Sequence, residues 1–402
     1  MGKPMKVLIV LDDIHLGGIS RSLLNYLPHI SAVADCDLLI FNYHGLDQSL
    51  IPANVRLLKP QDRLHMLGMS QAQIKGYSKT KALMRAGLAI LSRVVGGNGA
   101  RKLLFFGMKK LRGYDLAISF SQDVGWKTIS TGCNHFVLDK VEAKYKAAFI
   151  HCDYARFGGY DRRQASVYGR FDRVVCVSEA CKQSFVGKFP SLDAKTVVCE
   201  NFTDVEQVRQ KAELAPVTYD EAKLNVITVA RLGEEKGLLR AAEAVKRLVE
   251  KGKTGLCWTV VGDGPERAAI EAYLDENGLR PYIRLAGGTP NPYVYMKNAD
   301  LFLLPSYHEA APMVFGECHA LGLPILTTDT ISAKELVAER GLGTVCENST
   351  EGIFKGLEAA LDGEQKPQRL SPDVMGRING VAEDQMHGFL KSFQDEEKRD
   401  HL

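Results

Sequence analysis

The sequence lacks any long uncharged apolar run, and this absence argues against a transmembrane helix. The longest candidate, residues 301–326, is interrupted by prolines, a histidine and glutamates, whereas a helix that spans a bilayer needs about 20 consecutive apolar residues. The start of the chain, residues 1–11, has a short apolar run but passes straight into Asp12 and Asp13 without a small-residue cleavage site. We therefore expect a first strand there and not a signal peptide.

Closely spaced cysteine pairs are also missing. The nine cysteines are scattered along the chain, and no two of them form a C-x-x-C pair. Neither a zinc knuckle nor a disulfide framework is therefore predicted. Most have apolar neighbours, as in residues 174–177, which is typical of buried thiols in a reducing compartment. The sequence thus favours a cytoplasmic protein.

Acidic residues are scarce in one part of the chain. Residues 51–112 carry 13 basic side chains but a single acid, Asp62. A basic block of this density attracts anions. Because aromatic residues within it are few, a platform for single-stranded nucleic acid is disfavoured, and an anionic membrane surface or a phosphorylated substrate is favoured. The alternative is an ordinary solvated helical face.

A predicted helix over residues 79–95 lies inside this basic block. Its apolar residues at helical spacing are interspersed with basic ones; the two sets are Met84, Leu88, Leu91 and Val95, and Lys79, Lys81, Arg85 and Arg93. The pattern allows an interfacial helix that lies on a membrane. It equally allows a core helix of the first domain with a basic outer face, and both interpretations stay open.

What the chain does contain is a repeated alternation of short apolar runs with helical patterns. The runs are apolar on both faces and occur at residues 6–11, 36–41, 116–120, 147–151 and 173–177, and again at 224–230, 257–261, 283–286, 301–304, 324–328 and 343–346. Such runs are typical of parallel strands covered by helices on both sides. The sequence therefore predicts an α/β protein with two Rossmann-like, doubly wound parallel-sheet domains.

The polar stretch 201–218 separates the two series of strands and is interpreted as a hinge and linker. We place the first domain at residues 1–205 and the second at residues 206–371. The remaining residues, 372–402, have helical apolar spacing and are expected to form a helix that packs back on the first domain.

Glycine-rich turns follow predicted strands in both domains. Gly17 and Gly18 follow the first strand, and Gly262, Asp263 and Gly264 follow the strand that ends at residue 261. Glycine allows a ligand to approach the backbone closely, and the helix after each turn offers free N–H groups to an anion. These turns therefore mark one ligand-binding edge of each sheet.

Two cations follow the first strand of the second domain. Arg231 and Lys236 are spaced so that both can reach one site. A fixed cation near a diphosphate contributes about 4 kcal/mol at 4 Å and an effective dielectric of 20, before desolvation is subtracted. Such a pair can replace a bound metal ion. The alternative is an exposed Glu-Lys turn.

The most specific pattern spans residues 303–325. Two glutamates in it are separated by seven residues. Glu309 lies in a predicted loop, and Glu317 lies on a predicted helix that Pro312 is suited to open. The N–H groups just beyond a helix start are unsatisfied and attract an anion. We expect Glu317 to accept hydrogen bonds from hydroxyl groups, and the nucleotide site to include Ala311, Pro312, Met313 and Val314.

Together these motifs resemble glycosyltransferase family 4, retaining enzymes of the GT-B fold, in which two Rossmann-like domains face a central cleft. The resemblance also rests on residues 177–179, 201–204 and 291–300. It is dense from residue 174 to 345 and thin from 47 to 111, where the family has acceptor-specific loops. Residues 150–154 are similar to those of bacterial members that build capsular or other surface polysaccharides.

The resemblance implies transfer of a hexosyl group from a UDP-sugar to a polysaccharide or lipid-linked glycan. Arg231 and Lys236 would neutralise the departing diphosphate, assisted by the Gly17 and Gly18 loop. The resemblance also implies that Glu317 would bind the ribose and Glu309 the donor sugar. His151, at the end of a strand, would contact the sugar near the reacting carbon.

The resemblance implies no metal and no cofactor besides the nucleotide-sugar co-substrate. Residues 35–37 match the Asp-x-Asp metal motif of the unrelated GT-A enzymes, but they lie at the entrance of a predicted strand, so we interpret the match as a coincidence. Ala230 and Ala310 stand where the family commonly has glycine.

Two other functions stay open, namely a UDP-sugar epimerase of the GT-B fold and a non-catalytic nucleotide-binding partner subunit. The joint presence of His151, Arg231, Lys236, Glu309 and Glu317 argues against the second, because a decayed site tends to lose such residues. We expect a cytoplasmic protein, peripheral on the inner face of the membrane through residues 51–112, that does not bind nucleic acid.

Overall fold

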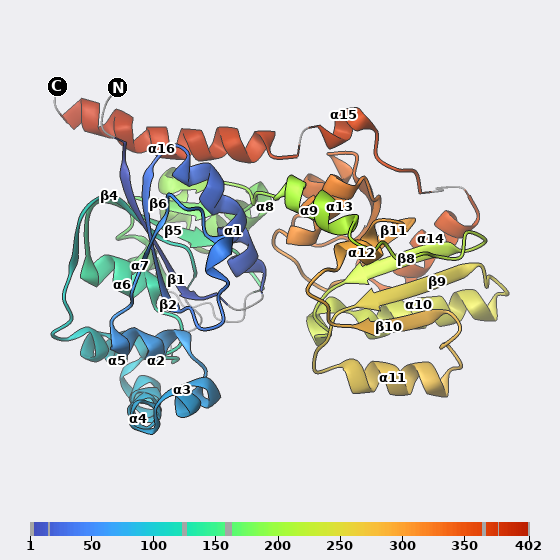
Figure 1. The fold of residues 1–402 in the computed structure, drawn as a ribbon, viewed down its shortest axis with the longest axis horizontal. Coiled ribbons are helices and arrows are strands. Elements are labelled where there is room, and N and C mark those ends of the chain that lie inside the picture. The colour runs from blue at the N-terminus through green and yellow to red at the C-terminus, as the bar shows by residue number, and fades with distance from the viewer. Residues whose placement is uncertain are drawn as a thin grey trace. The chain divides into compact units, whose positions relative to one another are not determined.

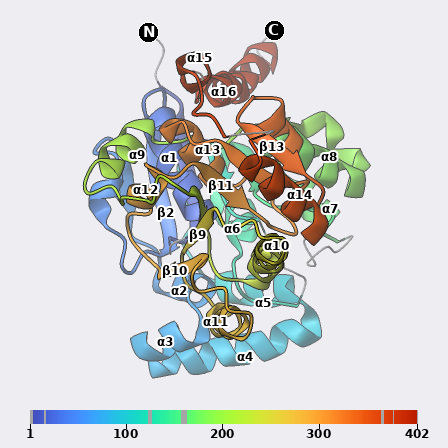
Figure 2. The ribbon, with the colours of Figure 1, turned by 90° about the vertical axis from the view of Figure 1, so that its right-hand side faces the viewer.

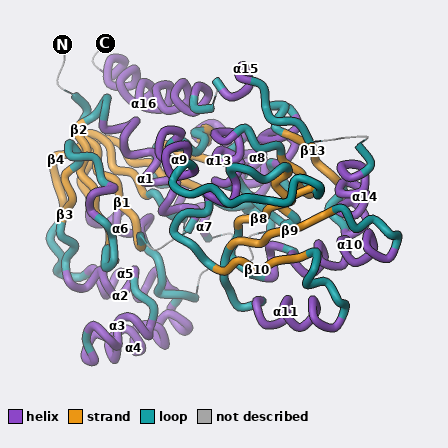
Figure 3. The backbone as a smooth tube through the Cα atoms, turned by 45° about the vertical axis from the view of Figure 1, so that its right-hand side comes forward, coloured by secondary structure: helices purple, strands orange, loops and turns teal. Residues whose placement is uncertain are grey.

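The structure is a computed structural model that describes residues 4–14, 17–122, 127–156, 163–363, 367–376 and 378–400. The chain divides into two compact units. Unit 1 comprises Met1–Phe202 and Ala382–Leu402, and unit 2 comprises Thr203–Val381. Figures 1 and 3 show a twisted sheet with helices around it in each unit. The predicted pair of Rossmann-like α/β domains is therefore confirmed.

Unit 1 contains a seven-stranded sheet in the order β3-β2-β1-β4-β5-β6-β7, with every pair of strands parallel. Residues 7–11 of β1 are all fully buried, because helices cover both faces of a parallel sheet. The strands are β1 (Lys6–Asp13), β2 (Asp35–Asn42), β3 (Arg56–Leu58), β4 (Leu111–Ser119), β5 (Val141–Ile150), β6 (Arg173–Cys176) and β7 (Thr196–Val198). The sequence did not predict β3 and β7, since three residues at a sheet edge carry too little pattern.

The helices of unit 1 are α1 (Gly18–Ser31), α2 (His65–Gly68), α3 (Gln71–Tyr77), α4 (Lys79–Val95), α5 (Gly97–Phe105), α6 (Cys133–Lys140), α7 (Gln164–Tyr168), α8 (Glu179–Lys188) and α16 (Gly380–Asp400). Helix α1 packs on the sheet because its apolar residues lie on one face, where Leu23, Leu27 and Ile30 are fully buried. The helix predicted over residues 79–95 coincides with α4.

Unit 2 contains a six-stranded parallel sheet in the order β10-β9-β8-β11-β12-β13. Its strands are β8 (Leu224–Val229), β9 (Leu256–Val261), β10 (Ile283–Gly287), β11 (Leu301–Leu304), β12 (Ile325–Thr328) and β13 (Gly343–Cys346). Its helices are α9 (Val205–Ala212), α10 (Leu238–Glu250), α11 (Arg267–Glu276), α12 (Tyr293–Met296), α13 (Met313–Leu321), α14 (Thr350–Leu361) and α15 (Pro372–Met375). The predicted strands of this half all occur, with ends shifted by at most a residue or two.

The boundaries between the units differ slightly from those expected. The chain enters unit 2 at Thr203 and returns to unit 1 at Ala382, so α15 belongs to unit 2. The stretch 201–218, expected to be a linker, contains α9, whose Val208 and Ala212 are buried in a core of unit 2. A short helix docked by two side chains gives little sequence signal, which explains the difference.

Helix α16 returns to unit 1, as the sequence predicted. Its apolar face joins the core of that unit through Ala382, Met386, Phe389, Leu390 and Phe393. The ring of Phe393 lies 4.9 Å from that of Tyr145 in β5. Within the described residues no helix is long and apolar enough to cross a membrane, and all nine cysteines are free thiols.

Each sheet reverses its strand order at one point, between β1 and β4 in unit 1 and between β8 and β11 in unit 2. Open parallel sheets bind ligands outside the carboxyl ends of the strands at this switch point, where two loops diverge and leave a crevice. The segments that follow β1, β4, β8 and β11 are therefore the first places to search for a site.

Candidate functional site

In unit 2, the loops that follow β8 and β11 are joined by an ion pair. Lys236, at the end of a single 3-10 turn (Glu234–Lys236), places its Nζ 2.6 Å from Oε1 of Glu309. The backbone N–H of Tyr307 also donates to the carbonyl of Glu235 at 2.9 Å. Two of the residues predicted to form the site, 73 positions apart, thus meet at the switch point of this sheet.

The carboxylate of Glu309 is held by a second donor. Ser306 Oγ donates to Glu309 Oε1 at 2.7 Å, and the side chains of Lys236 and Glu309 are only 23% and 11% exposed. Among the described residues, neither the other carboxylate oxygen nor the two remaining ammonium protons have a partner. Since an ammonium has three donors, the pair retains the capacity to bind both an anion and a hydroxyl group.

Arg240 of α10 positions the loop that carries this carboxylate. Its buried guanidinium donates to the carbonyl of Pro305 at 3.0 and 2.7 Å and to that of Ser306 at 2.8 Å. It also stacks on the ring of Tyr307 at 3.8 Å, and burial lowers its pKa. The sequence analysis missed this residue, because its acceptors are backbone groups about 65 residues away.

The glycines after β9 allow two backbones to touch. Gly262 has a φ of +146°, and a Cβ there would lie 1.8 Å from the carbonyl oxygen of Ala230; one on Gly264 would lie 2.4 Å from that of Leu232. The N–H of Leu232 donates to the carbonyl of Asp263 at 3.0 Å, while the Asp263 carboxylate accepts from the N–H of Gly264 at 2.8 Å. These three residues therefore hold the loop after β8 in place.

Arg231 lies in the same loop but not in the same ion pair. Its guanidinium is 63% exposed and pairs with Glu235 at 2.6 Å. The structure thus gives Arg231 and Lys236 separate glutamate partners and brings only Lys236 to Glu309. The Glu-Lys turn that the sequence left as an alternative is present, and its lysine is partly buried at the switch point.

Helix α13 begins without a side-chain cap. Pro312 is its N-cap residue in an extended conformation, so no side chain caps the first-turn N–H groups of Met313 and Val314, beyond Ala311, and an anion site at a helix start needs such uncapped groups. One turn further, the buried Glu317 accepts a hydrogen bond from the hydroxyl of Tyr293 at 3.0 Å. The sequence analysis did not identify Tyr293 as a partner of this carboxylate.

In unit 1, Gly17 and Gly18 form the start of α1. Gly17 is the extended N-cap residue, with no side-chain cap, and a Cβ on Gly18 would meet nothing within 4 Å. Within the part of the chain that the structure describes, nothing therefore blocks a close approach to Gly18 at the start of this 14-residue helix, and an anion site at a helix N-terminus requires such an approach.

His151 directly follows β5. Its backbone N–H donates to Gln122 Oε1 at 3.1 Å, and its ring lies 5.0 Å from that of Phe120 and 5.8 Å from that of Phe149. The Nε2 atom is buried and has no hydrogen-bond partner among the described residues, and burial lowers the pKa of His151 to about 4. The imidazole is thus neutral at neutral pH and packs against two aromatic rings, which also stack on each other.

Asp12, at the carboxyl end of β1, was not among the predicted site residues. Burial raises its pKa to about 6, against the opposing effect of a hydrogen bond from Ser121. Strands β1, β4 and β5 are neighbours, so Asp12, Ser121, Gln122 and His151 all belong to one edge of this sheet. Only the strand order could reveal this grouping.

Asp37 of the Asp-x-Asp match has a structural role. Arg56 Nε donates to it at 2.8 Å and Tyr114 OH at 2.7 Å, at the amino end of β2. Across the described part of the chain, no group of three or more His, Cys, Asp or Glu side chains is arranged to hold a metal ion.

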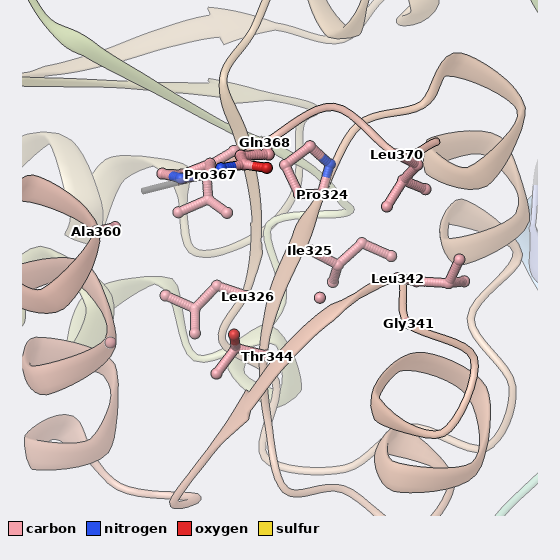
Figure 4. A pocket seen from close by; sticks show the side chains of 13 residues that line it. Pro324, Ile325, Leu326, Gly341, Leu342, Thr344, Ala360, Pro367, Gln368 and Leu370 are labelled. Atoms are coloured by element: carbon pink, nitrogen blue, oxygen red, sulfur yellow. The ribbon is translucent and has the colours of Figure 1, made fainter. Parts of the chain in front are cut away.

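A cavity of about 270 Å³ lies elsewhere in unit 2 (Figure 4). Its lining includes Leu301, Ile325 and Gly343, the first residues of β11, β12 and β13. The cavity is therefore at the amino edge of the sheet, opposite the Lys236–Glu309 pair, and is not part of this site.

Residues 210–374 match the family described as glycosyl transferases group 1. The chain is 31% identical over 153 residues to the putative colanic acid biosynthesis glycosyltransferase WcaL of Escherichia coli, covering 36% of this chain and 37% of WcaL. It is 33% identical over 138 residues to the lipopolysaccharide glucosyltransferase WaaG of Escherichia coli, covering 34% and 36% of the two chains. The alignments thus span about a third of the length of these curated relatives.

The fold extends over nearly the whole chain. Anabaena HepE, solved in complex with UDP, superposes with a TM-score of 0.66 at 16% identity and covers 96% of this chain and 100% of its own. The two sheets described above are therefore those of the GT-B fold. Residues 210–374, which contain every predicted site residue of unit 2, form a glycosyltransferase group 1 domain.

Proposed function

We propose that the chain is a retaining glycosyltransferase that transfers a hexosyl group from a UDP-sugar to a polysaccharide or a lipid-linked glycan. The Lys236–Glu309 pair, joined at 2.6 Å at the switch point of unit 2, is the observation that carries the proposal. The group 1 domain and relatives named for colanic acid and lipopolysaccharide synthesis support it. The UDP complex of HepE supports the choice of nucleotide.

The proposed step exchanges one C–O bond for another on the same face of the sugar. The bond between the anomeric carbon and the β-phosphate oxygen breaks, the acceptor hydroxyl oxygen bonds to that carbon, and the acceptor proton goes to the departing phosphate oxygen. Because the leaving group takes the proton, no second carboxylate is needed as a nucleophile. The protein's task is then to stabilise charge on the leaving diphosphate.

The residues of unit 2 suit this task. Lys236 retains two free ammonium donors, and the uncapped start of α13 offers the N–H groups of Met313 and Val314 to phosphate. Arg231, 63% exposed, is free to exchange Glu235 for a phosphate oxygen. Glu309 would accept from the sugar hydroxyls and Glu317 from those of the ribose.

Gly17, Gly18 and His151 retain the roles that the family resemblance implies. A His151 that is neutral at neutral pH, with its pKa lowered to about 4 by burial, would not place a positive charge beside the electron-poor anomeric carbon. Its ring can then contact the sugar without opposing the charge that develops on the carbon. We further place the reaction in the cytoplasm, at the inner face of the membrane.

The test compares turnover and binding in the full chain. Lys236→Gln is expected to lower kcat by about a hundredfold, the usual effect of removing one preorganised donor from a developing charge. Lys246→Gln serves as the matched control, because this partly exposed lysine of α10 pairs with Glu250 and not with Glu309. Glu317→Gln should weaken UDP binding in calorimetry, and Glu309→Gln should lower turnover more than UDP binding. Equal turnover in Lys236→Gln and Lys246→Gln would contradict the leaving-group role.

Two further measurements separate this proposal from its alternatives. Activity is expected to survive EDTA, because the cations that face the diphosphate are side chains. If EDTA abolishes activity and added Mg²⁺ or Mn²⁺ restores it, the proposal that the reaction needs no metal ion is wrong. Release of an epimerised sugar without any acceptor would identify an epimerase. UDP binding without turnover on any donor would identify a binding subunit.

A further inference from the structure

Helix α4 of unit 1 turns apolar side chains toward solvent. Leu83, Ile90 and Val94 are 76%, 64% and 80% exposed, and their spacing of seven and four residues places them on one face of the helix. Large apolar side chains that are exposed singly are ordinary, but a row of them along one helix face indicates an interaction surface.

The opposite face of α4 is buried and polar. Arg85 is 8% exposed and Ser92 1%. The Arg85 guanidinium donates to the Met66 carbonyl at 3.0 Å, to Gln71 Oε1 at 3.0 Å and to Ser130 Oγ at 3.1 Å. The helix is thus attached to unit 1 through hydrogen bonds, with its apolar side outward.

This orientation answers a question that the sequence left open. A core helix with a basic outer face agrees with the structure only in part. Lys79 and Arg93 are exposed, but Arg85 points inward and exposed apolar side chains lie on the outward side. Arg85 also cannot belong to a row of basic side chains that faces a membrane. Of the four apolar residues that the sequence placed at helical spacing, Met84 and Val95 are exposed, whereas Leu88 and Leu91 are half-buried. Leu83, Ile90 and Val94 are exposed as well.

The segments that flank α4 carry further exposed apolar side chains. Of 13 large apolar side chains exposed among the described residues, eight lie between residues 77 and 106; these eight, the apolar ridge, are Tyr77, Leu83, Met84, Ile90, Val94, Val95, Leu103 and Phe106. Figures 1 and 2 both place α3 and α4 side by side at the margin of unit 1, away from its sheet. The concentration of exposed apolar groups is therefore a local property of this margin.

Several basic side chains near the ridge are exposed and form no ion pair with the described residues. Lys75, Lys79, Arg93 and Lys102 are exposed on α3, α4 and α5 and form no ion pair with the described residues. The single acid of the block, Asp62, is paired with Lys81 at 3.0 Å. A second copy of the chain would bring the same positive charges to such an interface, so the surface does not suit self-association. An anionic surface with an apolar interior complements both features.

We propose that this margin docks onto an anionic lipid bilayer. Helix α4 lies along the surface, Leu83, Ile90 and Val94 enter the boundary between headgroups and acyl chains, and Lys79, Arg93 and Lys102 contact lipid phosphates. The inference rests on the proposed function only in that a lipid-linked acceptor would be met there. Its physical basis, the polar attachment and apolar exposure of α4, is independent of catalysis.

The test uses the full chain and sedimentation with vesicles of phosphatidylcholine, alone or mixed with phosphatidylglycerol. The triple variant Leu83→Gln, Ile90→Gln, Val94→Gln is expected to bind mixed vesicles at least about tenfold more weakly, because three apolar side chains no longer enter the bilayer. The matched control changes three exposed apolar residues outside the ridge, Val33, Leu214 and Val381, to Gln. We expect the control to bind like wild type.

A second pair of variants tests the charges. Changing Lys79, Arg93 and Lys102 to Gln should remove the preference for mixed vesicles, and high salt should do the same, since the Debye length falls to about 3 Å at 1 M. Changing Lys110 and Arg112, which pair with Glu142 at 3.0 Å each, should have a smaller effect.

Three outcomes would overturn the proposal. They are equal binding of the ridge triple variant and wild type to mixed vesicles, equal binding of wild type to both kinds of vesicle, and a dimer in sedimentation velocity that only the ridge variant loses. UDP binding by the ridge variant distinguishes the two proposals. If it is retained while vesicle binding never occurs, membrane docking fails and the transferase assignment stands.

Discussion

Two buried titratable groups at one sheet edge of unit 1 are expected to oppose each other in the pH dependence of stability. Burial raises the pKa of Asp12 from 3.8 to about 6 and lowers that of His151 from 6.5 to about 4. We choose Asp12→Asn as the perturbation, because an amide has the shape of the protonated carboxyl and still accepts a hydrogen bond from Ser121.

The sign follows from counting protons in the folded and unfolded states. Between pH 4 and 6 the folded protein keeps a proton on Asp12 that the unfolded chain releases, so this group's contribution to stability falls as pH rises. Between pH 4 and 6.5 the unfolded chain holds a proton on His151 that the folded protein does not, so this contribution rises with pH. At 1.36 kcal/mol per pKa unit, each amounts to about 3 kcal/mol.

In the wild type, the contributions of Asp12 and His151 to the pH dependence of stability nearly cancel. Each single variant removes one of them, so that the other can be measured. Asp12→Asn should stabilise unit 1 by about 3 kcal/mol at pH 7 but by only about 0.5 kcal/mol at pH 4, because the folded protein then keeps the proton on Asp12 while the unfolded chain, whose pKa is 3.8, has released only about half of it. His151→Gln should have the reverse profile, with its stabilising effect near pH 4. The double variant should lose both dependences.

The assay is amide hydrogen exchange of peptides from β1 and β4, whose opening reports on unit 1 separately from unit 2. Variant and wild type are compared at each pH from 4 to 7, so that the intrinsic exchange rate cancels. A difference for Asp12→Asn that stays constant over this range would refute the reasoning, since a lost contact without a titration has no such pH dependence.

Two further predictions concern unit 2. Gly262→Ala should lower the free energy of unfolding of unit 2 by about 3 kcal/mol or more, because φ is +146° and the new Cβ would lie 1.8 Å from the Ala230 carbonyl oxygen. Urea unfolding followed by tryptophan fluorescence in a Trp126→Phe background, which leaves Trp258 as the one tryptophan, checks this, with Gly255→Ala as the control. Arg240→Gln should lower the free energy of unfolding of unit 2 by about 3 kcal/mol, since the charged hydrogen bonds to the Pro305 carbonyl are lost. The same variant should bind UDP more weakly in calorimetry. A stable variant with normal UDP affinity would show that Arg240 does not position the loop.

Much of the fold was readable from local patterns. Parallel strands are buried on both faces, so each one is a short apolar run that can be recognised without its neighbours. The turns at Gly17 and Gly262 and the helix start at Pro312 are likewise local, because they depend on backbone conformations that only certain residues favour. The order of the strands within each sheet, in contrast, depends on long-range pairing.

The sequence predicted several residues of the candidate site but not the contacts between them. The sequence identified Lys236, Glu309 and Glu317 as candidates. It did not indicate that Lys236 pairs with Glu309 or that Arg240 holds the loop between them, since these contacts join residues 73 and 65 positions apart. The sequence did not identify Asp12 as a candidate, because the pKa of its carboxyl group is raised only once the fold buries it.

For helix α4, the sequence predicted the bounds of the helix but not which of its faces is buried. Its length and bounds were predicted correctly, since helical spacing is a local property. Its orientation was not, because apolar residues at helical spacing fit a protein core and a membrane surface equally well. Only the tertiary structure shows that Arg85 finds three hydrogen-bond acceptors inside unit 1. Those acceptors satisfy a buried guanidinium, and the apolar face is left toward solvent.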